Sequence, residues 1–92
     1  MMGIIEVAAK SRVVMTAGAS DILGTQLNAE ALANRHRKLN WGLATAPELD
    51  RNRQNIVRYG ELISRFRIRG VNLVVYTSEG WKTTIVARGD EL

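Results

Sequence analysis

The last third of the chain alternates apolar and polar residues with a period of two, the period of a β-strand. Two turn signals, Arg69-Gly70 and Ser78-Glu79-Gly80, divide this region. The runs between them are ELISRFRI (61–68), VNLVVYT (71–77) and WKTTIVAR (81–88). Because both links are short, consecutive runs are predicted to pair antiparallel as a three-stranded meander. The rest of the fold has to pack around that meander.

A two-residue turn at Arg69-Gly70 also fixes the expected register of the first two strands. It pairs Phe66 with Leu73 on one face and Arg65 with Val74 on the other. The first face is predicted to be the core. A slip of one residue would bury the arginines and expose Phe66, so every statement about this strand depends on the register.

Three arginines, Arg65, Arg67 and Arg69, occupy alternate positions of the first run. On a strand they would share one face, about 6.8 Å apart. Such a row can be a solvated face that prevents edge-to-edge association, or a contact surface that binds carboxylates or phosphates. The predicted neighbours Ile63 and Tyr76 add apolar area to the row, which favours the contact surface.

Upstream of the meander, the hydrophobic period becomes that of helices. Thr16 is a suitable N-cap for the first helix and Gly24 a suitable end, whereas Asn28 is predicted to cap the second. Pro47 fits the first turn of the third. The predicted helical runs are AGASDIL (17–23), LNAEALANRHRKL (27–39) and APELDRNRQNIVRYG (46–60).

Two short β-rich runs, 3–9 and 12–16, precede these helices and are predicted to supply a fourth strand. The expected fold is therefore α+β, with two to three short helices packed on one face of a small antiparallel sheet of three to four strands. At 92 residues, the chain is expected to form a single domain, 1–92, with a modest core.

The composition restricts the chemistry. No cysteine is present, so disulfides and thiolate chemistry are excluded. No apolar run approaches the ~20 residues that span a bilayer, and the start is too short and mixed for a signal peptide. The net charge is +4, and ten of the thirteen cations are arginine. Arginine forks onto carboxylates and phosphates, so this bias favours an acidic protein or nucleic acid as partner.

Few residues of the sequence are suited to catalysis. The one histidine, His36, lies on the apolar face of the second predicted helix, where a hydrogen-bonded structural role is favoured over a general base. Glu48 and Asp50 lie in the first turn of a helix, where they offset its dipole. No phosphate-binding glycine motif and no zinc-ligand spacing is present. The sequence predicts a non-enzyme with no cofactor, no metal and no small-molecule substrate.

The two tryptophans receive different predictions. Trp41 follows the second helix and is expected to plug a corner of the fold. Trp81 lies beside Lys82 at a predicted hairpin tip, where a contact role and a structural role are equally supported. The candidate partner-binding residues are Arg65, Arg67, Arg69, Tyr76, Trp81, Lys82, Arg35, Lys38, Arg51 and Arg58.

Six short motifs, each present once, follow one another along the chain. They are T-x-G-A (16–19), R-H-x-x-x-x-W-G (35–42), G-x-L-I-S-x-F (60–66), T-x-E (77–79), T-T (83–84) and an acidic residue near the end. Together they resemble a group of very small proteins encoded on plasmids, integrative elements and phages of proteobacteria. The resemblance covers roughly residues 15 to 92. This chain departs from the pattern at Leu39-Asn40, in its tail, and in the three arginines after Gly60.

The resemblance implies a setting rather than a reaction, because that group is largely without assigned activity. Small cofactor-free proteins of phages and plasmids often inhibit host defence, and anti-CRISPR proteins are the prominent case. The expectation is an inhibitor in the bacterial cytoplasm that binds a type I (Cascade-type) CRISPR-Cas protein–RNA complex through a basic face and blocks target-DNA binding. Its partners would be Cas subunits, with or without contact to the guide RNA.

Two alternatives stay open. The chain could be a plasmid or phage accessory protein that binds DNA or RNA directly, with an affinity that falls steeply with salt. It could also be an interaction module that makes no nucleic-acid contact, in which case neutralising the strand arginines would leave its function intact.

Overall fold

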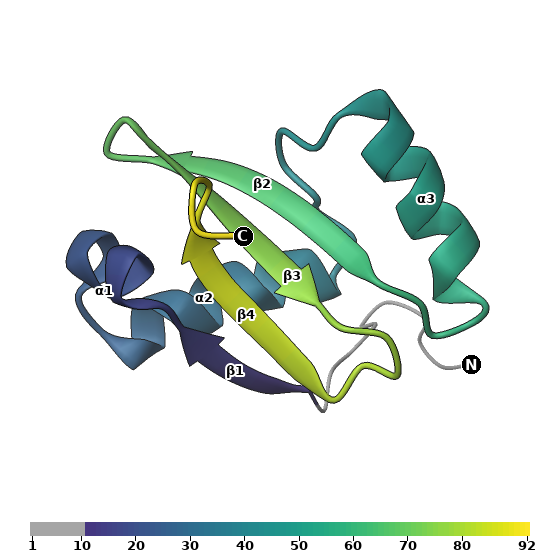
Figure 1. Ribbon diagram of the computed structural model, residues 1–92, viewed down its shortest axis with the longest axis horizontal. Helices are drawn as coiled ribbons and strands as arrows, with labels where there is room; N and C mark the ends of the chain where they lie inside the picture. Colours follow the sequence, from purple (N-terminus) through teal and green to yellow (C-terminus); the bar gives the residue numbers. More distant parts are fainter. Residues whose placement is uncertain (1–10) are drawn as a thin grey trace.

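The computed structural model describes residues 11–92 and contains a four-stranded sheet with helices (Figure 1). The predicted run 3–9 lies outside the described residues. The elements follow in the order β1 (Arg12–Met15), α1 (Ala17–Leu23), α2 (Gln26–Arg37), α3 (Ala46–Ile56), β2 (Leu62–Ile68), β3 (Val71–Thr77) and β4 (Thr83–Arg88). This order confirms the α+β prediction, with the N-terminal strand included.

The sheet has the strand order β1-β4-β3-β2. The predicted meander is confirmed, since β2–β3 and β3–β4 are antiparallel. Its register is also confirmed: Phe66 pairs with Leu73 and Arg65 with Val74. The sheet is mixed rather than antiparallel, because β1 runs parallel to β4. The three helices between β1 and β2 give the chain room to return in that direction.

Helices α1 and α2 cover one face of the sheet and build the core with it (Figure 1). The core consists of Val13, Ala19, Leu23, Ala29, Leu32, Ala33, Phe66, Leu73, Val75 and Val86. The third helix differs from the prediction of helices on one face, since α3 lies along the outer edge of β2 (Figure 1). The C-terminal segment crosses the other side of the sheet, which we call the open face.

The helix boundaries follow from side-chain caps. Thr16 caps α1 and Gly24 ends it with φ 81°, as predicted. The prediction that Asn28 caps α2 is wrong: the hydroxyl of Thr25 accepts from the Asn28 N–H, so the helix begins at Gln26. The Asn28 amide donates instead to the carbonyl of Leu23 at 2.6 Å, which ties α2 to α1.

The C-terminal tail is fixed against the start of α1. Glu91 accepts from the Thr16 hydroxyl at 2.5 Å, from the Gly18 N–H at 3.1 Å and from the Arg88 N–H at 2.7 Å. These hydrogen bonds hold the pKa of Glu91 below its usual value. A Cβ at Gly18 would meet the Glu91 carboxylate at 2.6–2.7 Å, so a larger residue there would displace the Glu91 side chain. The first and last motifs of the sequence pattern therefore meet in space.

Candidate partner-binding surface

The backbone edge of β2 is occupied along its proximal half, Leu62–Arg65. The amide of Asn52 in α3 bonds to both the N–H and the C=O of Ile63, at 3.0 and 2.8 Å. The segment before α3 does the same for Arg65, through the Trp41 carbonyl at 3.2 Å and the Leu43 N–H at 2.7 Å. No additional strand can pair with this half of β2.

The side chain of Arg65 is also engaged. Its guanidinium makes a forked contact with Glu48 of α3, with N···O distances of 2.6 to 3.1 Å. This hydrogen bonding lowers the pKa of Glu48 to about 2 and raises the pKa of Arg65. The first arginine of the alternating row is therefore compensated by a carboxylate of its own chain.

Arg67 and Arg69 have a different environment. Arg67 is exposed on the open face, opposite Asn72. Arg69 is not part of the strand: it lies in the β2–β3 turn with φ 54°, and its side chain lines a groove on the helix side of the sheet. The prediction that three arginines share one strand face is wrong at this third position. Within residues 11–92, neither Arg67 nor Arg69 makes an ion pair.

Arg35 of α2 joins these two arginines at the distal half of β2, which we define as Phe66–Ile68 together with the turn residue Arg69. The Arg35 guanidinium stacks on the ring of Phe66, 4.6 Å from its centroid. Its side chain is exposed and has no carboxylate partner in the described part of the chain. Three unpaired arginines thus surround the distal half of β2.

The other predicted cations are exposed but lie elsewhere. Lys38 caps the C-terminal end of α2. Arg51 is on α3, Arg58 follows α3, and Lys82 is in the β3–β4 turn. None of these four makes an ion pair within residues 11–92. They make the molecule basic without extending the group at the distal half of β2.

The predicted aromatic contacts are tied into the fold. Tyr76 is half-buried and donates to Glu61 at 2.6 Å, and burial together with this carboxylate raises its pKa to about 12. Trp81 is half-buried, donates to the carbonyl of Gly60 at 2.8 Å and packs edge-on against Tyr59. This geometry gives Trp81 a structural role. Trp41 is buried, as expected for a corner plug.

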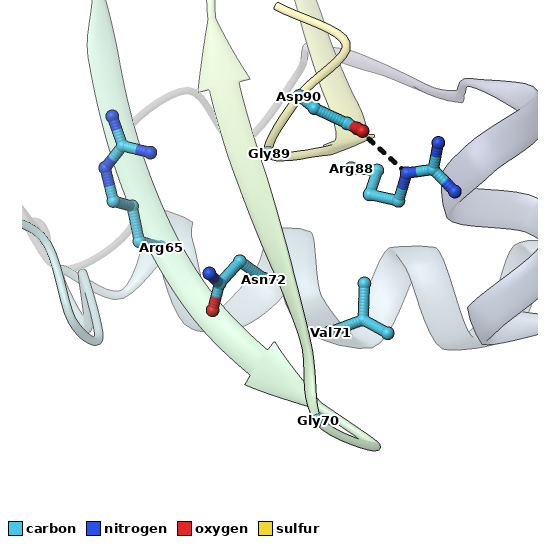
Figure 2. A pocket seen from close by; sticks show the side chains of 7 residues that line it. All are labelled: Arg65, Gly70, Val71, Asn72, Arg88, Gly89 and Asp90. Carbon is cyan, nitrogen blue, oxygen red and sulfur yellow. Dashed lines mark hydrogen bonds and ion pairs between the residues drawn. The ribbon is translucent and has the colours of Figure 1, made fainter.

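A hollow of about 530 Å³ on the open face does not gather unpaired cations (Figure 2). It is bordered by Arg65 and Arg88, whose side chains point away from one another in Figure 2. Arg88 is paired with Asp90 at 2.8 Å, and Arg65 with Glu48. Both guanidinium groups are thus compensated, and the hollow is not a preformed anion site.

His36 is fully buried between α2 and the sheet, where its ring bonds to two hydroxyls. Its Nδ1 lies 2.6 Å from Ser64 Oγ and its Nε2 lies 2.8 Å from Thr77 Oγ1. Burial, with a smaller contribution from Arg37, lowers its pKa to about 4. The ring is therefore neutral at pH 7, and the predicted hydrogen-bonded structural histidine is confirmed.

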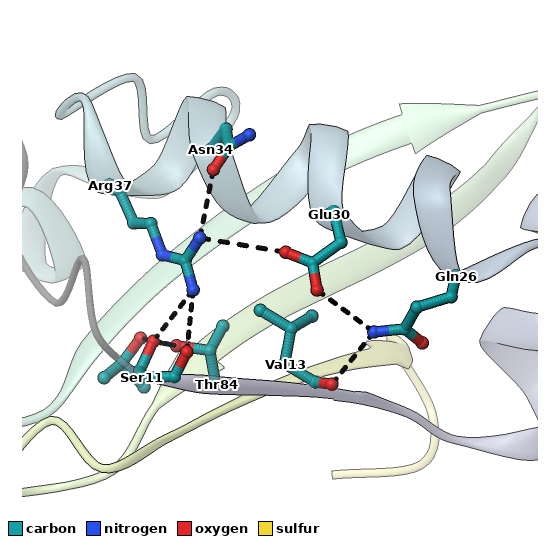
Figure 3. Close-up of polar contacts among 8 residues, drawn as sticks. Ser11, Val13, Gln26, Glu30, Asn34, Arg37 and Thr84 are labelled. Atoms are coloured by element: carbon teal, nitrogen blue, oxygen red, sulfur yellow. Dashed lines mark hydrogen bonds and ion pairs between the residues drawn. The ribbon is translucent and has the colours of Figure 1, made fainter.

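The same polar chain continues to a buried arginine (Figure 3). Thr77 bonds to Thr84 at 2.7 Å, and Thr84 to Ser11 at 2.6 Å. Arg37 donates to the Ser11 carbonyl at 2.8 Å and lies 3.8 Å from Glu30. Arg37 is buried although it is charged, because these acceptors satisfy its guanidinium inside the fold.

Residues 11–92 contain no group of three or more metal-ligating side chains placed to hold an ion. They also contain no helix with the length and apolar content needed to cross a membrane.

Comparison with known proteins adds no relative: no family model matches the chain, and no curated protein or solved structure matches it significantly. Several residues of the short sequence motifs have structural roles. His36, Trp41 and Thr84 are buried, and Thr16 and Gly18 hold the C-terminal tail. Most motif residues therefore belong to the scaffold, whereas Arg67 and Arg69 lie outside the motifs and Arg35 is the first residue of R-H-x-x-x-x-W-G.

Proposed function

We propose that this protein is a non-enzymatic counter-defence protein of a mobile element, an inhibitor that binds a type I (Cascade-type) surveillance complex and blocks target-DNA binding. The observation that carries the proposal is the group of three unpaired, exposed arginines, Arg35, Arg67 and Arg69, at the distal half of β2. Unpaired guanidinium groups bind carboxylates and phosphates with forked hydrogen bonds.

The environment of the titratable groups supports binding rather than turnover. His36 is neutral, enclosed and bonded through both ring nitrogens. Glu48, whose pKa is lowered to about 2, is ionised and paired with the Arg65 guanidinium. An inhibitor that acts by occupying a surface needs neither a base nor a nucleophile.

The choice of partner rests on the resemblance to small proteins of plasmids and phages. A Cascade-type complex presents both guide-RNA phosphates and acidic protein patches, and either would complement the arginines at the distal half of β2. An inhibitor seated there would exclude target DNA by occupancy.

The test is a pull-down from a bacterial host with an active type I system. The wild-type chain is compared with Arg35→Glu/Arg67→Glu/Arg69→Glu, and with Arg12→Glu/Arg51→Glu/Arg58→Glu as a control of equal charge change. We expect wild type and control to capture the complex and to reduce interference in cells, and the first variant to do neither. Capture of no complex by the wild-type chain would refute the proposal. If the chain instead binds free DNA or RNA with steep salt dependence, the direct nucleic-acid alternative holds.

A further inference from the structure

A groove of about 300 Å³ lies between the helices and the distal half of β2. Its floor is aliphatic, formed by Leu23, Leu32 and Ile68. Its rim is polar and positively charged, with Arg35, Arg69 and the Asn28 amide. We call this feature the α2–β2 groove.

The fold orients the side chain of one rim arginine, Arg35, and fixes the backbone of the other, Arg69. Arg35 is positioned by its stacking on Phe66, so its guanidinium is presented at the groove before any ligand arrives. Arg69 is carried by the tight turn after β2, where φ is 54°. Positioned cations lose less side-chain entropy on binding than cations on mobile stems.

The backbone of β2 is open beside this groove. Outward-pointing backbone groups alternate along an edge strand, and at Ile63 and Arg65 they are bonded to Asn52 and to residues 41–43. The same alternation directs the N–H and C=O of Arg67 outward, and no partner for them is found in residues 11–92. The edge is thus closed along its proximal half and open at Arg67.

From these features we infer that the α2–β2 groove binds an extended acidic segment of a protein partner. The segment adds as a short strand at Arg67, with two central apolar side chains on the aliphatic floor and the alternate carboxylates on the open face against Arg67. Carboxylates that flank the apolar pair on the groove side bind Arg35 and Arg69. This inference deepens the proposed function and rests on it for the identity of the partner. It assigns the contact to an acidic protein segment of the complex rather than to its guide RNA.

Two other occupants fit less well. A second copy of this chain pairing through β2 would bring the arginines of both strands together, and like charges on facing strands are destabilising. A single-stranded RNA would need an aromatic face on which to stack its bases. The floor is aliphatic, and the nearby Phe66 ring is covered by Arg35.

The test uses the purified chain and the synthetic glutamate–valine peptide Glu-Glu-Val-Glu-Val-Glu-Glu, whose outer glutamates share a face with the two valines. The charge control is the same peptide with every glutamate replaced by lysine. Binding is measured by calorimetry at low salt, and the Arg67 amide is followed by hydrogen exchange in NMR. We expect the acidic peptide to bind, the basic peptide not to bind, and the Arg67 amide to become protected from exchange. The variant Arg35→Glu/Arg69→Glu should weaken binding by roughly tenfold or more, and the control Arg51→Glu/Arg58→Glu by less than about threefold.

Each contrary result overturns the inference. These results are no binding of the acidic peptide, equal weakening by the two double variants, an unprotected Arg67 amide, or displacement of the peptide by an oligoribonucleotide that binds more tightly. Because the probe is a peptide, the outcome is independent of any host complex. If the peptide binds as expected but no surveillance complex is captured, the groove assignment stands and the proposed partner is wrong. If the complex is captured but the peptide is not bound, the proposed partner stands and the groove assignment is wrong.

Discussion

The two halves of β2 have similar sequences but opposite environments. In the proximal half, Arg65 is forked onto Glu48, and the backbone edge is closed by Asn52 and by residues 41–43. In the distal half, Arg67 and Arg69 have no carboxylate partner within residues 11–92. An alternating row of arginines is therefore not a binding surface in itself. Only the arginines that the fold leaves uncompensated have charge to offer a partner.

The largest expected effect on stability comes from a substitution at Gly42, whose backbone lies close against β2 and covers the edge of its proximal half. Gly42 has φ 60°, and a Cβ there would collide with the Arg65 carbonyl and the Phe66 ring. Gly42→Ala should cost on the order of 3 kcal/mol in the free energy of unfolding, measured by urea denaturation. Gly70→Ala is the matched control, since Gly70 also has positive φ but open space around it, and should cost about 1 kcal/mol. Equal losses would mean that the contact with β2 contributes nothing beyond backbone strain.

The second prediction concerns the buried histidine that bonds to Ser64 of the proximal half. The pKa of His36 is about 4 in the folded protein, against an ordinary value of 6.5. The unfolded chain therefore binds the proton more readily, so stability is complete above about pH 6.5 and falls as the pH drops toward 4. The loss assigned to His36 is about 3 kcal/mol across that window.

Two measurements check this pH dependence. Urea denaturation between pH 7 and pH 4 gives the total loss, and an NMR titration follows the imidazole of His36 alone. We expect its resonances in the folded protein to stay at their neutral positions down to about pH 5. A midpoint near 6.5 in the folded state would show that the ring reaches solvent, contrary to its buried position.

The third prediction breaks the pairing that distinguishes Arg65 from Arg67. Glu48→Gln keeps the shape of the side chain and its bond to the Thr45 N–H but removes the charge that faces Arg65. It should cost about 1–2 kcal/mol, because the hydrogen bonds to a charged guanidinium are weakened in a partly buried setting. Asp50→Asn, which affects the exposed pair with Arg53, should cost less than about 0.5 kcal/mol.

The same variant sharpens the comparison in a second way. Once Glu48 is neutral, Arg65 becomes an uncompensated cation like Arg67. Glu48→Gln should then bind the acidic glutamate–valine peptide more tightly than wild type does. An unchanged affinity would show that Arg65 is too far from the α2–β2 groove to contribute.

Local sequence signals predicted a large part of this fold. The β2–β3 register depends on a two-residue turn, and the start of α1 on the Thr16 side chain, so a few neighbouring residues determine each. The parallel pairing of β1 with β4 was missed because it joins segments about seventy positions apart, and no short motif encodes it. The start of α2 was misplaced because Thr25 and Asn28 are both residue types that cap helices. The Asn28 amide donates to the carbonyl of Leu23, which leaves Thr25 to cap α2.

The candidate site was predicted only in part. Composition and alternation identified the arginines. Whether an arginine is paired or unpaired depends on residues of other elements, which the local sequence does not indicate. Glu48 is 17 positions from Arg65, and the ring that positions Arg35 is on β2. The helix dipole explained Glu48 fully at the level of sequence, so its pairing with Arg65 had no separate signal. The buried position of Arg37 likewise depends on Ser11, which α2 meets only after folding.

The smallest expected effect on stability belongs to the distal half. Arg67→Glu/Arg69→Glu should change the free energy of unfolding by no more than about 0.5 kcal/mol, because neither side chain has a partner to lose within residues 11–92. Urea denaturation measures this, and the pull-down and peptide assays measure binding on the same preparation. A loss above about 1 kcal/mol would mean that these arginines stabilise the hairpin. A stable variant that no longer binds would show that the two halves of β2 have different functions. The arginines of the distal half would then contribute to partner binding and not to the stability of the fold.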